Sequence, residues 1–233
     1  LAAIFALAAI GVIQAQAQGP PDRPLRPTIR VTGEATVTSK PDQAEINIGV
    51  VTQAGTGQAA AAQNAQKQDA VLSELRKVLG SSAEIKTVSY SLNPNYRYPK
   101  EGGEPTIAGY TASNVVQVKT SDLGQVGRVI DVAAQSGANT VQSLRFLLKD
   151  EQMVRSQALA EAAVKARGKA DAIAAALGLK ILRVLHIEEG GGSPQPIPRF
   201  AAAELRAAPA PTPVESGSID VVATVTLTLE IAQ

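Results

Sequence analysis

The amino-acid sequence predicts an α+β fold, a mainly antiparallel sheet with helices packed on it. Two observations carry this prediction. Apolar residues recur at every second position in some segments and at every third or fourth in others, which are the spacings of half-buried strands and amphipathic helices. Glycines and prolines stand where the spacing changes, as turns and helix ends require. The predicted order of elements is ββαββαβαββ.

The first 18 residues carry no charge and predict export. An apolar block at 1–13 leads into Ala15-x-Ala17, the small-residue pattern that signal peptidase cleaves. This block is shorter than the roughly 20 residues that a helix needs to cross a bilayer. We therefore expect a cleaved signal peptide at 1–18, a Pro-rich lead-in at 19–28 and one domain at 29–233.

The predicted domain begins with two strands and a helix. Residues 29–37 and 44–50 alternate between apolar and polar, with the turn Lys40-Pro41-Asp42 between them. From Gly57 the spacing lengthens, and Gly80 suits the left-handed cap of a helix of about six turns. The expected apolar face of this helix comprises Ala61, Ala65, Leu72, Leu75 and Leu79.

A long hairpin, a second helix and a strand come next. β-rich segments at 85–98 and 106–120 flank a polar tip at 99–105. Ser121-Asp122 suits the N-cap of a helix that Gly137 ends. Residues 141–148 predict a further strand. The expected apolar face of this second helix comprises Leu123, Val126, Ile130 and Ala133.

The C-terminal third has the clearest patterns. Residues 150–177 predict a helix ended by Gly178, and its Ala-rich face favours a close approach to a sheet. Strands are predicted at 180–188 and 219–231. Between them, residues 190–218 contain six prolines and a Gly-Gly-Gly-Ser run, a composition that predicts a flexible excursion. The expected helix face comprises Leu159, Ala162, Ala166, Ala170, Ile173 and Leu177.

Charge and composition exclude several classes of function. The 22 basic and 21 acidic residues nearly cancel and do not cluster, which argues against the basic surface that nucleic acids require. The chain has no cysteine, so it has neither a disulfide nor the lipid-accepting residue of a lipoprotein. We expect a protein released into the periplasm, whose contact with a membrane, including the outer membrane, is at most peripheral.

The sequence shows no signature of catalysis or of cofactor binding. His186 is the only histidine, and no Gly-x-Ser-x-Gly elbow presents a nucleophile. A metal site would have to use His186, Glu188 and Glu189, but Glu189 points to the opposite face of a strand from the other two. Metal sites need three or four convergent ligands. We therefore expect no enzymatic activity, no cofactor and no metal.

All four tyrosines fall within the predicted hairpin, and two interpretations stay open. One is cross-strand packing inside the hairpin, which contributes about 0.2–1 kcal/mol per pair. The other is a contact surface for a partner subunit, because tyrosine is enriched in interface cores. The residues of this candidate interface are Tyr90, Tyr96, Tyr98 and Tyr110.

Short motifs along residues 29–231 resemble those of the SIMPL-domain family. They include Val31-Thr-Gly-Glu-Ala-Thr-Val37, Gly109-Tyr110-x-Ala112-x-Asn114, Gly137-Ala138-Asn139 and Ala158-Leu159-x-x-Ala162, in that order. The resemblance implies an exported α+β protein of the bacterial envelope. It further implies that at least one member assembles into a large ring, and it implies no established enzymatic activity and hence no catalytic residues.

Two functions from different classes follow. The first is an exported envelope protein without catalytic activity that acts as a homo-oligomeric structural or interaction protein, with envelope stress as its setting. The alternative is a periplasmic binding module for a small apolar ligand or peptide, which the excursion at 190–218 and the balanced charge favour. A cavity between sheet and helices would favour this alternative.

Overall fold

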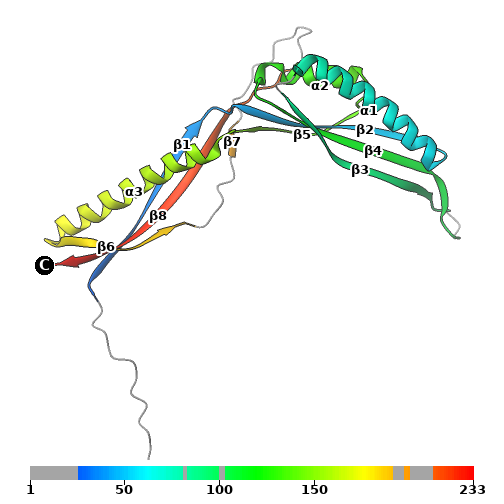
Figure 1. Cartoon of the computed structure of the whole chain (residues 1–233). Helices are drawn as coiled ribbons and strands as arrows, with labels where there is room; N and C mark the ends of the chain where they lie inside the picture. The colour runs from blue at the N-terminus through cyan, green and yellow to red at the C-terminus, as the bar shows by residue number, and fades with distance from the viewer. Residues whose placement is uncertain (1–25, 81–82, 100–102, 191–196, 200–211) are drawn as a thin grey trace, which may run out of the picture.

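The described strands of the computed structural model divide between two four-stranded antiparallel sheets, one covered on one face by a single helix and the other by two (Figure 1). The structure describes residues 26–80, 83–99, 103–190, 197–199 and 212–233. The predicted signal peptide and most of the lead-in lie outside these residues. The predicted α+β class and antiparallel pairing are confirmed.

The first sheet is built from the two ends of the domain. Its order is β1-β8-β6, and β7 pairs with the start of β8. One long helix, α3, lies along β1 and β8 (Figure 1). The elements of this half are β1 (Thr28–Ser39), α3 (Glu151–Ala176), β6 (Lys180–Glu189), β7 (Ile197–Arg199) and β8 (Ser218–Ala232).

The second sheet is built from the middle of the chain, in the order β3-β4-β2-β5. Two helices, α1 and α2, cover one face of it (Figure 1). A 3-10 turn, Leu123–Gln125, precedes α2. The elements of this half are β2 (Gln43–Ala54), α1 (Gly57–Leu79), β3 (Glu84–Arg97), β4 (Thr106–Thr120), α2 (Val126–Gln135) and β5 (Thr140–Leu147).

Consecutive strands β1 and β2 lie in different sheets, with the predicted proline turn between them. The backbone N–H of Asp42 donates to the carbonyl of Leu147 at 3.1 Å, and its carboxylate accepts from the N–H of Lys149 at 2.6 Å. These bonds tie the turn to the end of β5. The chain therefore passes from one sheet to the other at a fixed point beside β5.

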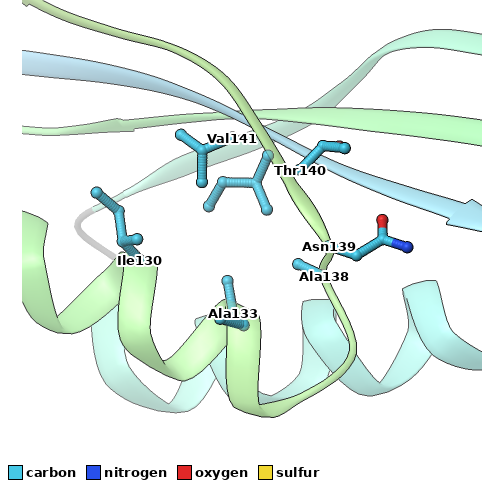
Figure 2. Close-up of a pocket in the computed structure, with 8 residues that line it drawn as sticks. Ile130, Ala133, Ala138, Asn139, Thr140 and Val141 are labelled. Carbon is cyan, nitrogen blue, oxygen red and sulfur yellow. The ribbon is translucent and has the colours of Figure 1, made fainter.

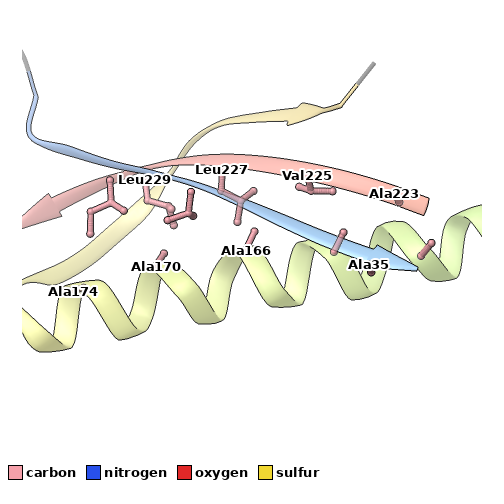
Figure 3. Close-up of a cluster of buried hydrophobic side chains, with 12 residues drawn as sticks. Ala35, Ala166, Ala170, Ala174, Ala223, Val225, Leu227 and Leu229 are labelled. Atoms are coloured by element: carbon pink, nitrogen blue, oxygen red, sulfur yellow. The ribbon is translucent and has the colours of Figure 1, made fainter. Parts of the chain in front are cut away.

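The long helix α3 packs on the first sheet at very short range (Figure 3). A Cβ atom on Gly33 of β1 would lie 2.1 Å from the carbonyl oxygen of Ala162 and 2.4 Å from the nitrogen of Ala166. Such an approach is open to glycine alone. Five alanines at four-residue spacing form the buried face of the helix: Ala158, Ala162, Ala166, Ala170 and Ala174.

The predicted face of α3 is partly wrong. Leu159 packs against the core as expected, but Ile173 and Leu177 are exposed and Ala174 is buried instead. The predicted face assumed a straight stripe. A four-residue repeat turns by about 40° per step relative to the helix axis, so the buried row drifts around the helix as it follows the twisted strands.

The first helix of the second half, α1, begins and ends as the sequence indicates. The Thr56 side chain accepts from the N–H of Ala59 at 3.2 Å, and Gly80 has a φ of 60°. In the first half of α1, Ala60 and Asn64 are buried in place of the predicted Ala61 and Ala65. Asn64 is buried there, because its amide donates to backbone carbonyls of β2 and β4 at 2.7 and 3.2 Å.

The predicted cap of the second helix is wrong in detail. The carboxylate of Asp122 accepts from the side chain of Gln125 at 2.6 Å rather than from a helical N–H. The helix is preceded by the 3-10 turn instead of beginning at a side-chain cap. Val126 and Ala133 are buried as expected, Leu123 and Ile130 pack at the edge of the core, and Gly137 follows the helix with a φ of 117°.

Part of the excursion at 190–218 is ordered against the first sheet. The three-residue strand β7 pairs with residues 218–220 of β8, which the sequence analysis did not predict. Thr212 reaches α2, where its hydroxyl donates to the carboxylate of Asp131 at 2.7 Å. Residues 191–196 and 200–211 of the predicted excursion lie outside the described residues.

Replacing Gly33 by alanine tests the close approach of α3. We expect Gly33→Ala to lower the free energy of unfolding by about 3 kcal/mol, the upper end of overpacking costs, because the clash is with helix backbone. Gly168→Ala, on the exposed side of the same helix, is the control and should raise stability by up to about 1 kcal/mol. Urea unfolding measures both, and equal stability of the two variants would contradict the proposed packing.

Candidate functional site

The β3–β4 hairpin extends beyond the rest of the second sheet. The pairing of β2 with β4 stops at Tyr110, whereas β3 and β4 remain paired as far as Arg97 and Thr106. Figure 1 shows this end of the hairpin at the extremity of the molecule. We call the hairpin from Tyr90 to Tyr110 the tyrosine ribbon. It contains all four tyrosines.

The tyrosines of the ribbon divide into one packed and three exposed side chains. Tyr110 is partly buried beside the first turn of α1, where its ring and Leu92 flank Gly57. Tyr90, Tyr96 and Tyr98 are between 52% and 73% exposed. The register places Tyr90 opposite Asn114 and Tyr96 opposite Ile107, an exposed apolar residue that the sequence analysis did not single out. The ribbon thus presents aromatic surface to solvent.

A cavity of about 270 Å³ lies between α2 and the β2–β5 edge of the second sheet (Figure 2). Ala133 and Ile130 of α2 form its floor, and Val141 of β5 lies opposite them. Val141 is 48% exposed, although its register partner Ile48 is buried in the core. The remaining lining residues are Ile48, Ala134, Ala138, Asn139 and Thr140.

The residues considered for a metal site separate as their strand positions predict. His186 and Glu188 share the open face of the first sheet, with ring Nε2 and carboxylate 3.1 Å apart. Glu189 lies on the other face and pairs with Arg155 of α3 at 2.5 Å. Glu188 also accepts from Arg30 at 2.8 Å. Within the described residues, no three His, Cys, Asp or Glu side chains gather in a way that could hold a metal ion.

The most buried carboxylate of the described chain, Glu45, has a structural role. It lies on the open face of the second sheet between Arg145 of β5 and Lys119 of β4, with the lysine ammonium 3.5 Å away. Two cations from neighbouring strands compensate one buried anion, as buried charges require. No unpaired acid or base remains there for proton transfer.

Edge strand β6 is joined to β8 by ion pairs on the open face of the first sheet. The guanidinium of Arg183 donates to the carboxylate of Glu230 at 2.6 Å, and Arg26 approaches the same carboxylate at 3.5 Å. The hydrogen bond from Arg183 is the main reason that the pKa of Glu230 lies below its ordinary value, with the charge of Arg26 adding to it. The pairs hold the strand and offer no reactive group.

Strand β6 exposes apolar side chains that the sequence analysis did not single out. Leu182, Val184, Leu185 and Ile187 are between 39% and 63% exposed. The signal was present in the sequence, because apolar residues occupy both odd and even positions of Lys180–Glu189. Strict alternation would have placed one set in the core and the other in solvent.

Comparison with known proteins assigns the family. The sequence profile described as SIMPL, a protein of unknown function (DUF541), matches residues 29–229. This chain belongs to the SIMPL family. The match spans both sheets and the three α-helices of the described residues, so the resemblance inferred from the motifs is confirmed.

Individual relatives of this SIMPL protein come from several bacteria. The 26 kDa periplasmic immunogenic protein of Brucella melitensis is 32% identical over 173 residues, which cover 73% of this chain and 69% of the relative. The same-named protein of Brucella abortus is equally similar. The uncharacterized protein YggE of Escherichia coli K12 is 25% identical over 206 residues, 88% of this chain and 83% of the relative.

None of the described helices is both long enough and apolar enough to cross a bilayer. Within the described residues, exposed large apolar side chains lie in the tyrosine ribbon, beside the cavity next to α2, along β6 and on α3 at Met153 and Val164.

The ion pair between β6 and β8 predicts a pH dependence. Folding lowers the pKa of Glu230 below its ordinary 4.5, so the pair stabilises the fold above that pH and the contribution is lost as the pH falls through the folded-state pKa. In Arg183→Gln this pKa should rise toward the ordinary value. NMR titration of Glu230 measures it, and Arg128→Gln on the exposed side of α2 is the control. An unchanged titration in Arg183→Gln would contradict the pairing.

Proposed function

We propose that this SIMPL protein is an exported, non-enzymatic, homo-oligomeric protein of the bacterial envelope that acts through its surface. The observation that carries the proposal is the tyrosine ribbon, in which Tyr90, Tyr96 and Tyr98 are each more than half exposed. Large aromatic side chains with a polar tip are enriched in interface cores, where the ring is buried and the hydroxyl finds a partner.

The form of the ribbon supports self-association. It is a two-stranded projection in which the backbone of β3 is paired with that of β4. Its aromatic side chains lie on a paired backbone, so a partner would meet a largely preorganised surface at a low entropy cost. Leu92 and Ile107 add exposed apolar area between the tyrosines, and apolar area gathered in one place marks a contact surface rather than ordinary scatter.

A periplasmic location is supported by the relatives. Two Brucella proteins that are 32% identical to this chain are named periplasmic. The uncharged N-terminal segment with Ala15-x-Ala17 is the matching export signal. In the periplasm the assembled protein would contact the envelope peripherally, and envelope stress is the setting we propose for it.

We propose the absence of enzymatic activity from the partners and positions of the candidate side chains. His186 is exposed on an edge strand, and its ring contacts the carboxylate of Glu188 rather than a serine hydroxyl within the described residues. Glu45 is compensated by Lys119 and Arg145. Catalysis by acid–base chemistry needs a positioned group in reach of a bound substrate, and neither side chain lines the cavity beside α2.

Light scattering tests the role of the ribbon. Wild-type protein should have a mass several times that of one chain, and the double variant Tyr96→Ser, Tyr98→Ser should have a lower mass because it loses aromatic contact area. The control is Met153→Ser, Val164→Ser, which removes two exposed apolar side chains of α3. Thermal unfolding checks that all three proteins are equally folded. A wild type that stays monomeric at every concentration would refute the proposal.

A second function, binding of a small apolar ligand, is favoured by the cavity beside α2. Its volume of about 270 Å³ exceeds the roughly 150 Å³ of an apolar cavity that binds benzene. Ile48, Ile130 and Val141 supply apolar walls, and alanines leave the space between them. The ligand class that this lining selects is a compact, uncharged, largely apolar molecule.

Thermal shift with indole as the probe tests the cavity. Indole should stabilise the wild type, by about 2.7 kcal/mol at a concentration 100 times its Kd. Ala133→Leu fills the floor of the cavity and should abolish the shift. Ala160→Leu, on the exposed side of α3, should leave it intact. A shift that survives in Ala133→Leu would place the binding elsewhere.

A further inference from the structure

Buried amide side chains lie between α1 and the second sheet. Asn64 and Gln68 are one helical turn apart on the buried face of α1, and they are 0% and 4% exposed. A helix face that packs on a sheet ordinarily carries apolar side chains at such positions, as Val71, Leu75 and Leu79 do further along α1. The interface of α1 is therefore polar around Asn64 and Gln68 and apolar in its C-terminal half.

Strand β4 adds a third amide. The side chain of Asn64 donates to the carbonyls of Val50 and Ala112 at 2.7 and 3.2 Å, which fixes it over the β2–β4 ladder. Asn114 is the register partner of Val50. It lies two residues from Ala112, so its side chain projects from the same face of the sheet, the face that α1 covers. We call Asn64, Gln68 and Asn114 the amide layer.

Four polar atoms of the amide layer are buried without a hydrogen-bond partner within the described residues. They are Oδ1 of Asn64, Oε1 and Nε2 of Gln68, and Oδ1 of Asn114. Such a group loses its hydration on folding and gains nothing in exchange, and buried polar groups of native proteins are therefore paired with protein or with ordered water. Gln68 is the strongest case, because both atoms of its amide are unpartnered.

We propose that the amide layer is a binding site for internal water, in which two molecules bridge α1 to β4. A buried water molecule makes about three hydrogen bonds to otherwise unpaired polar groups. The layer offers three acceptor oxygens and the amide donor of Gln68. Since one water molecule donates only two hydrogen bonds, three acceptors require two molecules. One of these accepts a hydrogen bond from Nε2 of Gln68.

The chemistry of the layer favours water over other occupants. Asn64 and Gln68 are almost completely buried, so the occupant must be small. A metal cation would bring a charge that three neutral amides do not compensate, and a buried charge without compensation is costly. An apolar molecule would leave all four polar atoms unpaired.

The amide layer lies at the base of the tyrosine ribbon. Tyr90 is the register partner of Asn114, and Leu92 and Tyr110 flank Gly57 in the first turn of α1. Water that bridges α1 to β4 thus helps to hold the helix against the strands from which the ribbon projects. The site needs only the folded chain, so it goes beyond the proposed function and does not depend on self-association.

Oxygen-17 relaxation dispersion of water counts the water molecules held inside a protein, and it tests the site in the full chain. Gln68→Met keeps the length of the side chain but removes both amide atoms, so the count should fall by one or two molecules. Gln66→Met, on the exposed side of α1, is the matched control and should leave the count unchanged. Circular dichroism checks that both variants are folded. An unchanged count in folded Gln68→Met would overturn the proposal.

A crystal structure of the wild-type chain that resolves ordered water tests the site without any substitution. It should show a water oxygen at about 2.7–3.2 Å from Nε2 of Gln68, and a second water in contact with the layer. A direct hydrogen bond from Gln68 to Asn64 or Asn114, or an ion or larger molecule in the site, would contradict the assignment of water. None of these outcomes changes the expected mass of the oligomer, so failure of this site is distinguishable from failure of the proposed function.

Discussion

The close contact between α3 and β1 is the constraint on which much of this structure depends. Because Gly33 has no side chain and the helix presents alanine at every fourth position, helix backbone lies against strand backbone. A helix of roughly 10 Å diameter covers about two strands that are 4.8 Å apart. One helix over a three-strand path thus covers β1 and β8 and leaves most of β6 uncovered.

In the second half, too, the helices cover less width than the sheet on which they pack. Four strands are wider than α1 alone can cover, and α2 has only 10 residues. Two features follow. Edge strand β3 carries its tyrosines in solvent, and a cavity remains where α2 does not reach β5. All the surfaces to which we assign contacts are places where an apolar sheet extends beyond its helices.

This arrangement bears on our proposal that the protein acts through its surface. Its buried charges are compensated, as at Glu45, and its one histidine lies exposed on an edge strand. The exposed tyrosine ribbon at one end of this SIMPL chain is the feature on which the proposed self-association rests.

The sequence by itself determined the kind and order of most elements. Alternation at 29–37 and 219–231 and the caps at Gly80 and Gly178 depend on neighbouring residues, so they can be inferred locally. Tertiary structure alone decided that β1 and β2 belong to different sheets, that Ile173 is exposed and Asn64 buried, and that β6 has no outer neighbour within the described chain. These depend on which distant strand pairs with which and on how a twisted sheet meets a straight helix. Local spacing carries no information about either.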